Sequence, residues 1–158
     1  MNQILQLYLE DFAAGQSFAG TRRVVNQEDF SCFAALTGDA HPIHYDADYA
    51  ARTKFGRPLA HGLLVMAWSA LGATEMSQRL EASMIALIEQ GCAFLAPVFV
   101  GDEITPRFVV DSVELPAAQS GGRLRINVEI IKADSTVCLR GFHVYQIKCR
   151  GRDGETTS

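Results

Sequence analysis

A stretch of apolar residues in the middle of the chain constrains its fold more than any other feature. From Leu63 to Ala73 the residues are Leu, Val, Met, Ala and Trp, interrupted by Ser69 and Gly72. The stretch predicts a helix that begins at Leu63 and ends near Ser77, with apolar side chains on every face. Because a surface helix keeps a polar stripe, this helix must be covered on most sides by other elements.

The second half of the chain provides segments that can cover it. Four segments read as strands separated by short turn signals: 84–94, 103–113, 123–132 and 136–148. Residues 123–130 alternate between polar and apolar, so one face of that strand is expected to meet water. The short separations favour antiparallel pairing. We therefore predict an α+β chain with a hot-dog fold, in which a bent antiparallel sheet wraps around a long buried central helix.

The composition predicts one globular unit. The chain has 158 residues, of which 48% are apolar and 20% charged, and its net charge is −4. We expect a single domain over residues 1–150 and a polar, disordered tail over 151–158. No basic patch indicates nucleic-acid binding, and the longest apolar run is too short to cross a membrane. The amino terminus lacks a secretory pattern and the four cysteines lack CxxC spacing, so we expect reduced, buried or semi-buried thiols in a cytoplasmic protein.

Two capping signals mark the ends of the first predicted helix. A helix is expected over residues 27–36, after a first strand that ends near Val25, because its apolar residues recur at helical spacing. Asn26 is the expected N-cap of this helix, and Gly38 lies just past its end, where glycine readily adopts a left-handed conformation. Asp39 therefore falls on the turn that leaves the helix.

The octapeptide Thr-Gly-Asp-Ala-His-Pro-Ile-His, residues 37–44, carries the clearest chemical signal. It places Asp39 five residues before His44, on a loop that Pro42 stiffens. A carboxylate and an imidazole on one short loop can hold a water molecule between them, as an enzyme that adds or removes water requires. Alone, each residue has a structural interpretation, a turn aspartate or a hydrogen-bonded histidine. Their specific pattern favours the catalytic interpretation.

The dipeptide His61-Gly62 precedes the long predicted helix. The first N–H groups of a helix have no partner within it and carry the positive end of its dipole. A glycine there lets a ligand oxygen approach the backbone closely, so the position can stabilise an oxyanion. The simpler interpretation is that Gly62 eases a tight turn.

A metal site is the competing interpretation of the histidines. His41 and His44 form an H-x-x-H pattern that Asp39 and His61 can join. The pattern flanks a proline on an irregular loop, without a second such pair or an acidic cluster nearby, so we expect no metal. Arg57 is a candidate for contact with a phosphate, although a solvated surface role is the simpler interpretation.

Three blocks of the sequence together resemble MaoC-like dehydratases, which include the (R)-specific enoyl-CoA hydratases. They are Phe33–Asp46 with the following Tyr49-Ala50, Phe55–Leu64, and Phe94–Asp102. The resemblance spans most of residues 20–113, and the first block is its most specific part. It implies that Asp39 and His44 are catalytic and that the Gly62 amide polarises a thioester carbonyl.

One position departs from the family pattern. His41 stands where the family usually has an asparagine before the proline. We expect that asparagine to order the loop around the catalytic pair, and His41 either replaces it in that role or signals an altered substrate or weaker activity. The expected substrate-binding residues are His41, Pro42, His61 and Arg57.

The resemblance also implies a reaction and an assembly. A trans-2-enoyl thioester would be hydrated reversibly to an (R)-3-hydroxyacyl thioester, with coenzyme A as part of the substrate and no separate cofactor. The expected assembly is a homodimer or a dimer of dimers, with coenzyme A in a groove formed by two chains. Two alternatives stay open, an acyl-CoA thioesterase on the same fold and a non-catalytic protein that binds acyl thioesters. The acyl chain length and the choice between coenzyme A and acyl carrier protein are also open.

Overall fold

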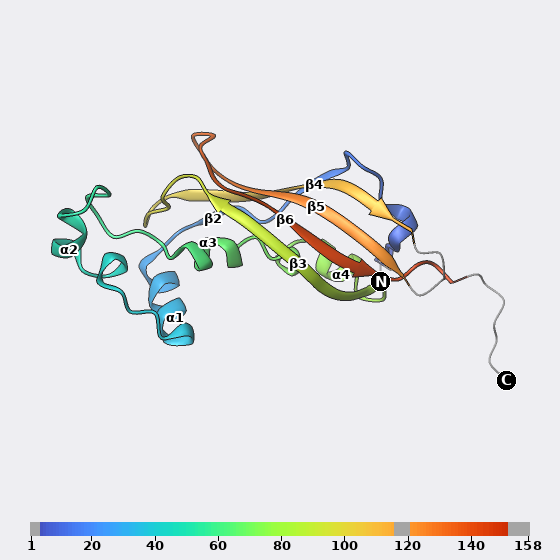
Figure 1. Ribbon diagram of the computed structural model, residues 1–158, viewed down its shortest axis with the longest axis horizontal. Helices are drawn as coiled ribbons and strands as arrows, with labels where there is room; N and C mark the ends of the chain where they lie inside the picture. The colour runs from blue at the N-terminus through green and yellow to red at the C-terminus, as the bar shows by residue number, and fades with distance from the viewer. Residues whose placement is uncertain (1–3, 116–120, 152–158) are drawn as a thin grey trace.

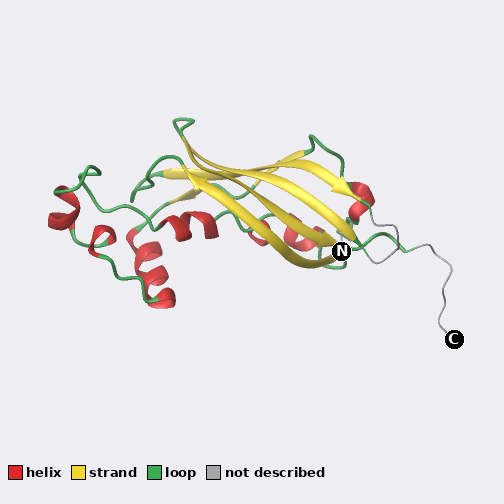
Figure 2. Cartoon of the chain, in the orientation of Figure 1, coloured by secondary structure: helices red, strands yellow, loops and turns green. Residues whose placement is uncertain are grey.

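One bent antiparallel sheet with helices along one side forms the protein (Figures 1 and 2). The computed structural model describes residues 4–115 and 121–151. The elements are, in chain order, the 3-10 helix η1 (Leu9–Asp11), β1 (Ser17–Ala19), β2 (Arg23–Val24), α1 (Gln27–Thr37), the 3-10 helix η2 (Pro42–His44), α2 (Ala47–Ala51), α3 (Gly62–Ala67), the 3-10 helix η3 (Leu71–Ala73), α4 (Met76–Arg79), β3 (Met84–Phe94), β4 (Glu103–Glu114), β5 (Gly122–Lys132) and β6 (Val137–Ile147).

The sheet confirms the predicted fold class. Its strands are ordered β1-β4-β5-β6-β3, with β2 also paired to β4, and every pair is antiparallel. The four long strands lie where the sequence predicts them. Strand β5 alternates between buried apolar residues, each at most 1% exposed, and polar residues; the buried ones are Leu124, Ile126, Val128 and Ile130. One face of the strand therefore meets solvent, as predicted.

The first strand, expected over residues 16–25, is two short strands instead. Gly20 lies between them and donates its N–H to the carbonyl oxygen of Pro106 in β4 (2.8 Å). Pro106 has no N–H to donate in return, so the ladder cannot continue past this position. Gly20 also has little room for a side chain, because a Cβ there would lie 3.1 Å from the Pro106 ring.

The long central helix is a second correction. The helix expected over residues 63–77 is divided into α3, η3 and α4, because the backbone is extended at Ala70 (φ −59°, ψ 123°) and again at Thr74 (φ −120°, ψ 176°). Ser69 lies just before the first break, and its hydroxyl donates to the Met66 carbonyl (2.6 Å). A hydroxyl that bonds to a nearby carbonyl competes with regular helix bonding. Leu63 is 58% exposed, so α3 is also covered on fewer sides than predicted.

A buried polar chain lies beside the break. The His143 ring bonds through Nε2 to the Ser69 hydroxyl (3.2 Å) and through Nδ1 to the Tyr145 hydroxyl (2.9 Å). The single Ser69 proton goes to Met66, so His143 Nε2 donates to Ser69 and Nδ1 accepts from Tyr145. His143 is therefore neutral. Burial raises the pKa of Tyr145 to about 12, which keeps that hydroxyl protonated.

Two apolar clusters fill the space between the sheet and the helices. One gathers η1, η3 and α4 against the sheet around Phe108 and Leu124. The other gathers α1 and α3 around Phe30, Val65 and Trp68. The second cluster packs α1, which leads into the octapeptide, against α3, which begins at Gly62, so it positions the candidate site.

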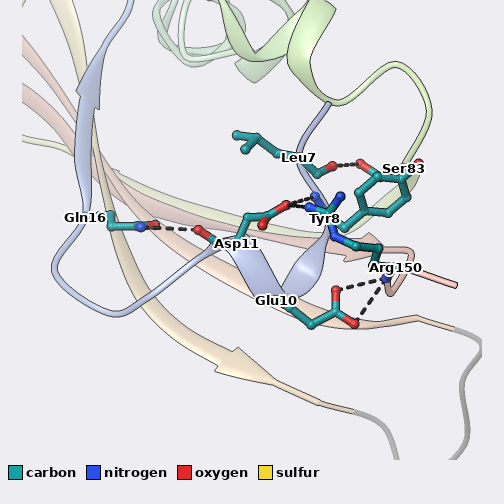
Figure 3. A network of polar contacts seen from close by, with 7 residues as sticks. All are labelled: Leu7, Tyr8, Glu10, Asp11, Gln16, Ser83 and Arg150. Carbon is teal, nitrogen blue, oxygen red and sulfur yellow. Dashed lines mark hydrogen bonds and ion pairs between the residues drawn. The ribbon is translucent and has the colours of Figure 1, made fainter. Parts of the chain in front are cut away.

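The amino-terminal segment is tied to the sheet at the end away from α1 and α2 (Figures 1 and 3). The Ser83 hydroxyl donates to the Leu7 carbonyl (2.5 Å), and the Arg150 N–H donates to the Glu10 carboxylate (2.9 Å). Asp11 accepts from the N–H of Tyr8 (2.8 Å). This network holds residues 7–11 at the end of the sheet opposite the octapeptide.

The remaining expectations concern the chain more broadly. No helix in the part that the structure describes has the length and apolar character needed to cross a membrane. The four cysteines are unpaired as predicted, but Cys32 is exposed rather than buried. The expected disordered tail lies, from residue 152 onward, outside the described residues, and the single-domain and cytoplasmic expectations stay predictions.

Candidate active site

Helix α1 and its two caps place Asp39 in the candidate site, as the sequence predicts. Asn26 accepts from the Asp29 N–H (3.0 Å), and Asp29 accepts in return from the Asn26 N–H (2.9 Å). At the other end Gly38 is left-handed (φ 76°). Its N–H donates to the Ala34 carbonyl (2.7 Å), which ends the helix. Asp39 follows at once on an exposed turn.

The loop after Asp39 is ordered by His41. The His41 N–H donates to the Asp39 carboxylate (3.3 Å), and its ring Nδ1 accepts from the Ile43 N–H (3.3 Å). The ring nitrogen therefore caps η2, in which Pro42 occupies the first helical position. An asparagine oxygen can perform the same capping role. This geometry supports a loop-ordering role for His41.

His44 is held in one orientation by the chain that leads to α3. Its Nδ1 lies 2.7 Å from the Leu59 carbonyl oxygen. A carbonyl oxygen only accepts, so Nδ1 carries the proton and the neutral ring has a free lone pair at Nε2. The Leu59 segment is itself fixed, because the next residue, Ala60, donates to the Val98 carbonyl (2.8 Å).

His61 packs directly against His44. The two ring centroids are 3.7 Å apart and the planes differ by 26°. His61 is 2% exposed and also contacts the ring of Phe33, at a centroid distance of 4.7 Å. Burial, followed by the neighbouring His44, lowers the pKa of His61. The His61 ring is therefore uncharged at neutral pH.

The structure brings Asp39, His44 and His61 together. One side-chain oxygen or nitrogen from each of the three lies within 4.8 Å of the others. A water molecule that makes two hydrogen bonds of about 2.8 Å bridges groups up to about 5.6 Å apart. The Asp39 carboxylate and the His44 imidazole are therefore close enough to hold one water between them.

These three residues also have the composition of a metal site, but the ring geometry is unfavourable. Ring nitrogens bind a metal along lone pairs that lie in the ring plane. The planes of His44 and His61 are stacked, so their lone pairs do not converge on one point. His41, the other member of the H-x-x-H pattern, is outside the cluster. The expectation of no metal stays a prediction.

Gly62 is the first residue of α3, and its N–H has no acceptor within the helix. A Cβ at this position would lie 3.1 Å from the Phe94 ring, so any larger residue here would force that ring to shift. Gly62 lines a cavity of ≈ 380 Å³ together with apolar residues and Lys54. Because His61 precedes Gly62 and stacks on His44, the amide lies next to the candidate pair.

Two residues show where reasoning from the sequence was incomplete. Arg57, a predicted substrate-binding residue, stacks on the Phe99 ring (4.1 Å) and is not among the residues that line the Gly62 cavity. Tyr45 was not predicted to have a role, yet its hydroxyl contacts His61 and the Asp39 backbone. Its only signal was a polar aromatic residue next to His44.

Comparison with known proteins points to one family. Residues 11–128 match the family described as "MaoC like domain". A 3-hydroxybutyryl-CoA dehydratase from Methylorubrum extorquens is 34% identical over 118 residues, 75% of this chain and 71% of its own length. An (R)-specific enoyl-CoA hydratase from Aeromonas caviae is 36% identical over 85 residues, 54% of this chain and 61% of its own length.

Solved structures agree with this. A protein from Archaeoglobus described as a monoamine oxidase regulatory protein matches with a TM-score of 0.85 and 28% identity, over 92% of this chain and 97% of its own. The (R)-hydratase of A. caviae, described as involved in PHA biosynthesis, matches with a TM-score of 0.70 and 27% identity, over 89% and 99%. The chain therefore belongs to the MaoC-like family.

Proposed function

We propose that the chain adds water to trans-2-enoyl thioesters to give (R)-3-hydroxyacyl thioesters, and catalyses the reverse dehydration. The chain is a hydro-lyase of the kind that its relatives' names describe, enoyl-CoA hydratase or 3-hydroxyacyl dehydratase. The observation that carries the mechanism is the separation of Asp39 and His44, which suits one bridging water. The (R) configuration is supported by similarity to two enzymes named as (R)-specific.

Asp39, His44 and the Gly62 amide supply the groups that this reaction needs. The Gly62 N–H donates to the thioester carbonyl, which makes C3 of the substrate electrophilic. The His44 lone pair at Nε2 accepts a hydrogen bond from one water proton and so orients the water. That proton stays on the oxygen and becomes part of the product hydroxyl. Asp39 accepts the other proton while the water oxygen attacks C3. The resulting enolate takes that proton at C2, so one water is added across the double bond and both residues return to their starting states.

The acyl chain requires an apolar channel near Gly62. A cavity of ≈ 450 Å³ lies along α3 and the break that follows it. Met66 and Ala67 line it from α3, one turn after Gly62, and Leu80 and Met84 line it farther on. This position supports an acyl chain that runs along α3 away from the carbonyl. We propose coenzyme A as the carrier and part of the substrate, with no separate cofactor.

The open edge of the sheet supports the proposed homodimer or dimer of dimers. Among the strands of residues 4–115 and 121–151, β3 is the last in the sheet order and pairs only with β6. Three of its apolar side chains, Ile85, Leu87 and Ile88, are 43–49% exposed. An exposed apolar edge strand is a template for pairing with another chain. Pairing of β3 with its copy would form one continuous sheet and bring the two halves of a coenzyme A groove together.

The test is the loss of enoyl-thioester absorbance when the purified protein meets crotonyl-CoA. We expect rapid loss with the wild type, little loss with Asp39→Asn, and an (R)-3-hydroxybutyryl product. Release of free thiol instead would indicate a thioesterase. Binding of crotonyl-CoA and longer or branched enoyl-CoAs without any absorbance change would indicate a binding protein and overturn the proposal.

A further inference from the structure

The Tyr45 hydroxyl touches three separate parts of the candidate site. It lies 3.1 Å from the Phe30 carbonyl oxygen in α1 and 3.2 Å from the Asp39 carbonyl oxygen on the loop. It also lies 2.8 Å from Nε2 of His61, the residue that precedes α3. These contacts connect α1, the octapeptide and the start of α3 through one atom.

The direction of each hydrogen bond follows from the chemistry of the partners. Both carbonyl oxygens only accept, so the hydroxyl proton points toward them. The hydroxyl oxygen then accepts from His61, whose Nε2 is also 3.2 Å from the Asp39 carbonyl oxygen. His61 is therefore the tautomer with its proton on Nε2. Its Nδ1 is buried and has no hydrogen-bond partner in the described part of the chain.

This arrangement fixes the His61 ring, and the ring fixes two functional groups. One face of the ring stacks on His44 at a centroid distance of 3.7 Å. Through its backbone, His61 is the N-cap of α3, where Gly62 presents its amide. The hydroxyl that holds the ring also contacts the backbone of Asp39. Within the described structure, Tyr45 is the one residue that hydrogen-bonds to both the Asp39 carbonyl and the His61 ring, which are also bonded to each other.

We propose that Tyr45 is a positioning residue whose hydroxyl holds Asp39 and His44 at the correct position relative to the Gly62 amide. The inference rests on the proposed function, since this relative position matters only if water attacks a carbonyl-activated substrate. Tyr45 does not touch the reacting atoms. Its hydroxyl keeps its proton at neutral pH because burial, followed by the charge of Asp39, raises the pKa of Tyr45.

Kinetics of four variants on crotonyl-CoA test this role. Tyr45→Phe keeps the ring and removes the hydroxyl, and His61→Phe keeps a ring against His44 and removes the Nε2 proton. We expect each to lower kcat by about 10- to 100-fold with KM changed by less than about threefold, because misplacement of reacting groups acts on turnover. The double variant should lose no more than the stronger single variant, because both changes remove one contact.

Tyr49→Phe is the matched control. Tyr49 lies four residues away in α2, and no hydrogen bond of its hydroxyl is recorded in the described structure. We expect its kcat and KM to equal those of the wild type. A Tyr45→Phe variant that melts earlier but turns over normally per folded molecule would show a purely structural role and overturn the proposal. Additive losses in the double variant would also overturn it.

A second measurement does not depend on turnover. Nitrogen-15 NMR of the histidine rings should show His61 protonated at Nε2 in the wild type, with this resonance shifted in Tyr45→Phe and unchanged in Tyr49→Phe. If the His61 resonance does not shift when the Tyr45 hydroxyl is removed, the result contradicts the contact between Tyr45 and His61. Wild-type protein inactive on all enoyl-CoAs would overturn the proposed function and this role with it. An active wild type with a fully active Tyr45→Phe overturns only the role of Tyr45.

Discussion

His44 and His61 form a stacked pair of imidazole rings, with centroids 3.7 Å apart, at the centre of the candidate site. Two cations at this distance repel each other strongly in a partly buried setting. The burial of His61 and the proximity of His44 accordingly lower the pKa of His61. His61 thus serves as a neutral surface against which His44 is held.

The first prediction concerns the dependence of stability on pH. Burial lowers the pKa of both His61 and His143 in the folded protein, whereas an unfolded histidine has a pKa of about 6.5. Below that pH the unfolded chain binds protons that the folded chain does not, so the free energy of unfolding falls as the pH falls. The urea midpoint should therefore decrease from about pH 7 to about pH 5.

Replacement of one buried histidine isolates this effect from that of the carboxylates. In His143→Gln the midpoint should depend less steeply on pH than in the wild type, because one proton-binding group of the unfolded state is gone. The absolute stability of the variant is lower, since the bonds to Ser69 and Tyr145 are altered. Equal slopes in the two proteins would show that His143 does not contribute.

The second prediction concerns the catalytic pair. Asp39→Asn removes the base and His44→Ala removes the ring that orients the water, so each should lower kcat by about 10²- to 10⁴-fold. Asp39 is exposed, and within the described residues its carboxylate accepts only from the nearby His41 N–H, so its variant should keep the wild-type melting temperature. Near wild-type turnover in both variants would contradict the assigned roles.

The third prediction concerns the Gly62 amide. In Gly62→Ala the new methyl would lie 3.1 Å from the Phe94 ring, which must move. Phe94 is 52% exposed, so the ring has room to move and the fold should survive. The displaced ring and the methyl both obstruct the approach of the thioester carbonyl, and we expect kcat to fall by up to about 100-fold.

Gly151→Ala is the control for this variant. A Cβ at Gly151 meets no atom within 4 Å, the residue does not have a positive φ, and it lines neither the Gly62 cavity nor the proposed acyl channel. Its turnover should stay close to that of the wild type. If Gly62→Ala hydrates crotonyl-CoA as fast as Gly151→Ala does, the Gly62 amide is not the oxyanion donor.

The fourth prediction concerns His41, which stands where the family usually has asparagine. Since the His41 Nδ1 caps η2, His41→Asn should retain both stability and most of the turnover. His41→Ala removes the cap and should cost about 0.5–2 kcal/mol of stability, with a loss of kcat as the loop loosens. If His41→Asn loses activity as severely as His41→Ala, the ring has a role in substrate choice beyond capping.

The sequence predicted those features that depend on local rules. The Asn26 cap, the left-handed Gly38 and the alternation in β5 are each decided by a few neighbouring residues, and the structure shows all three. The helix break at Ala70 was not predictable, because it is accompanied by the bonds of Ser69 and His143, which are 74 residues apart. The same holds for Tyr45, whose contacts with His61 arise only when the chain folds back.

The last prediction concerns the proposed dimer. If β3 pairs with its copy, a charge on its exposed edge should prevent pairing, because a buried unpaired charge is costly at an interface. Ile88 is 44% exposed and lies at an irregularity of the β3–β6 ladder. Ile88→Lys should therefore fold as a monomer.

The matched control is Val109→Lys, because Val109 is 40% exposed but lies in β4, which has neighbours on both sides. Light scattering should give the mass of a dimer or larger assembly for the wild type and the control, and that of one chain for Ile88→Lys. An unchanged mass in Ile88→Lys would place the interface elsewhere, and a monomeric wild type at micromolar concentration would exclude the dimer.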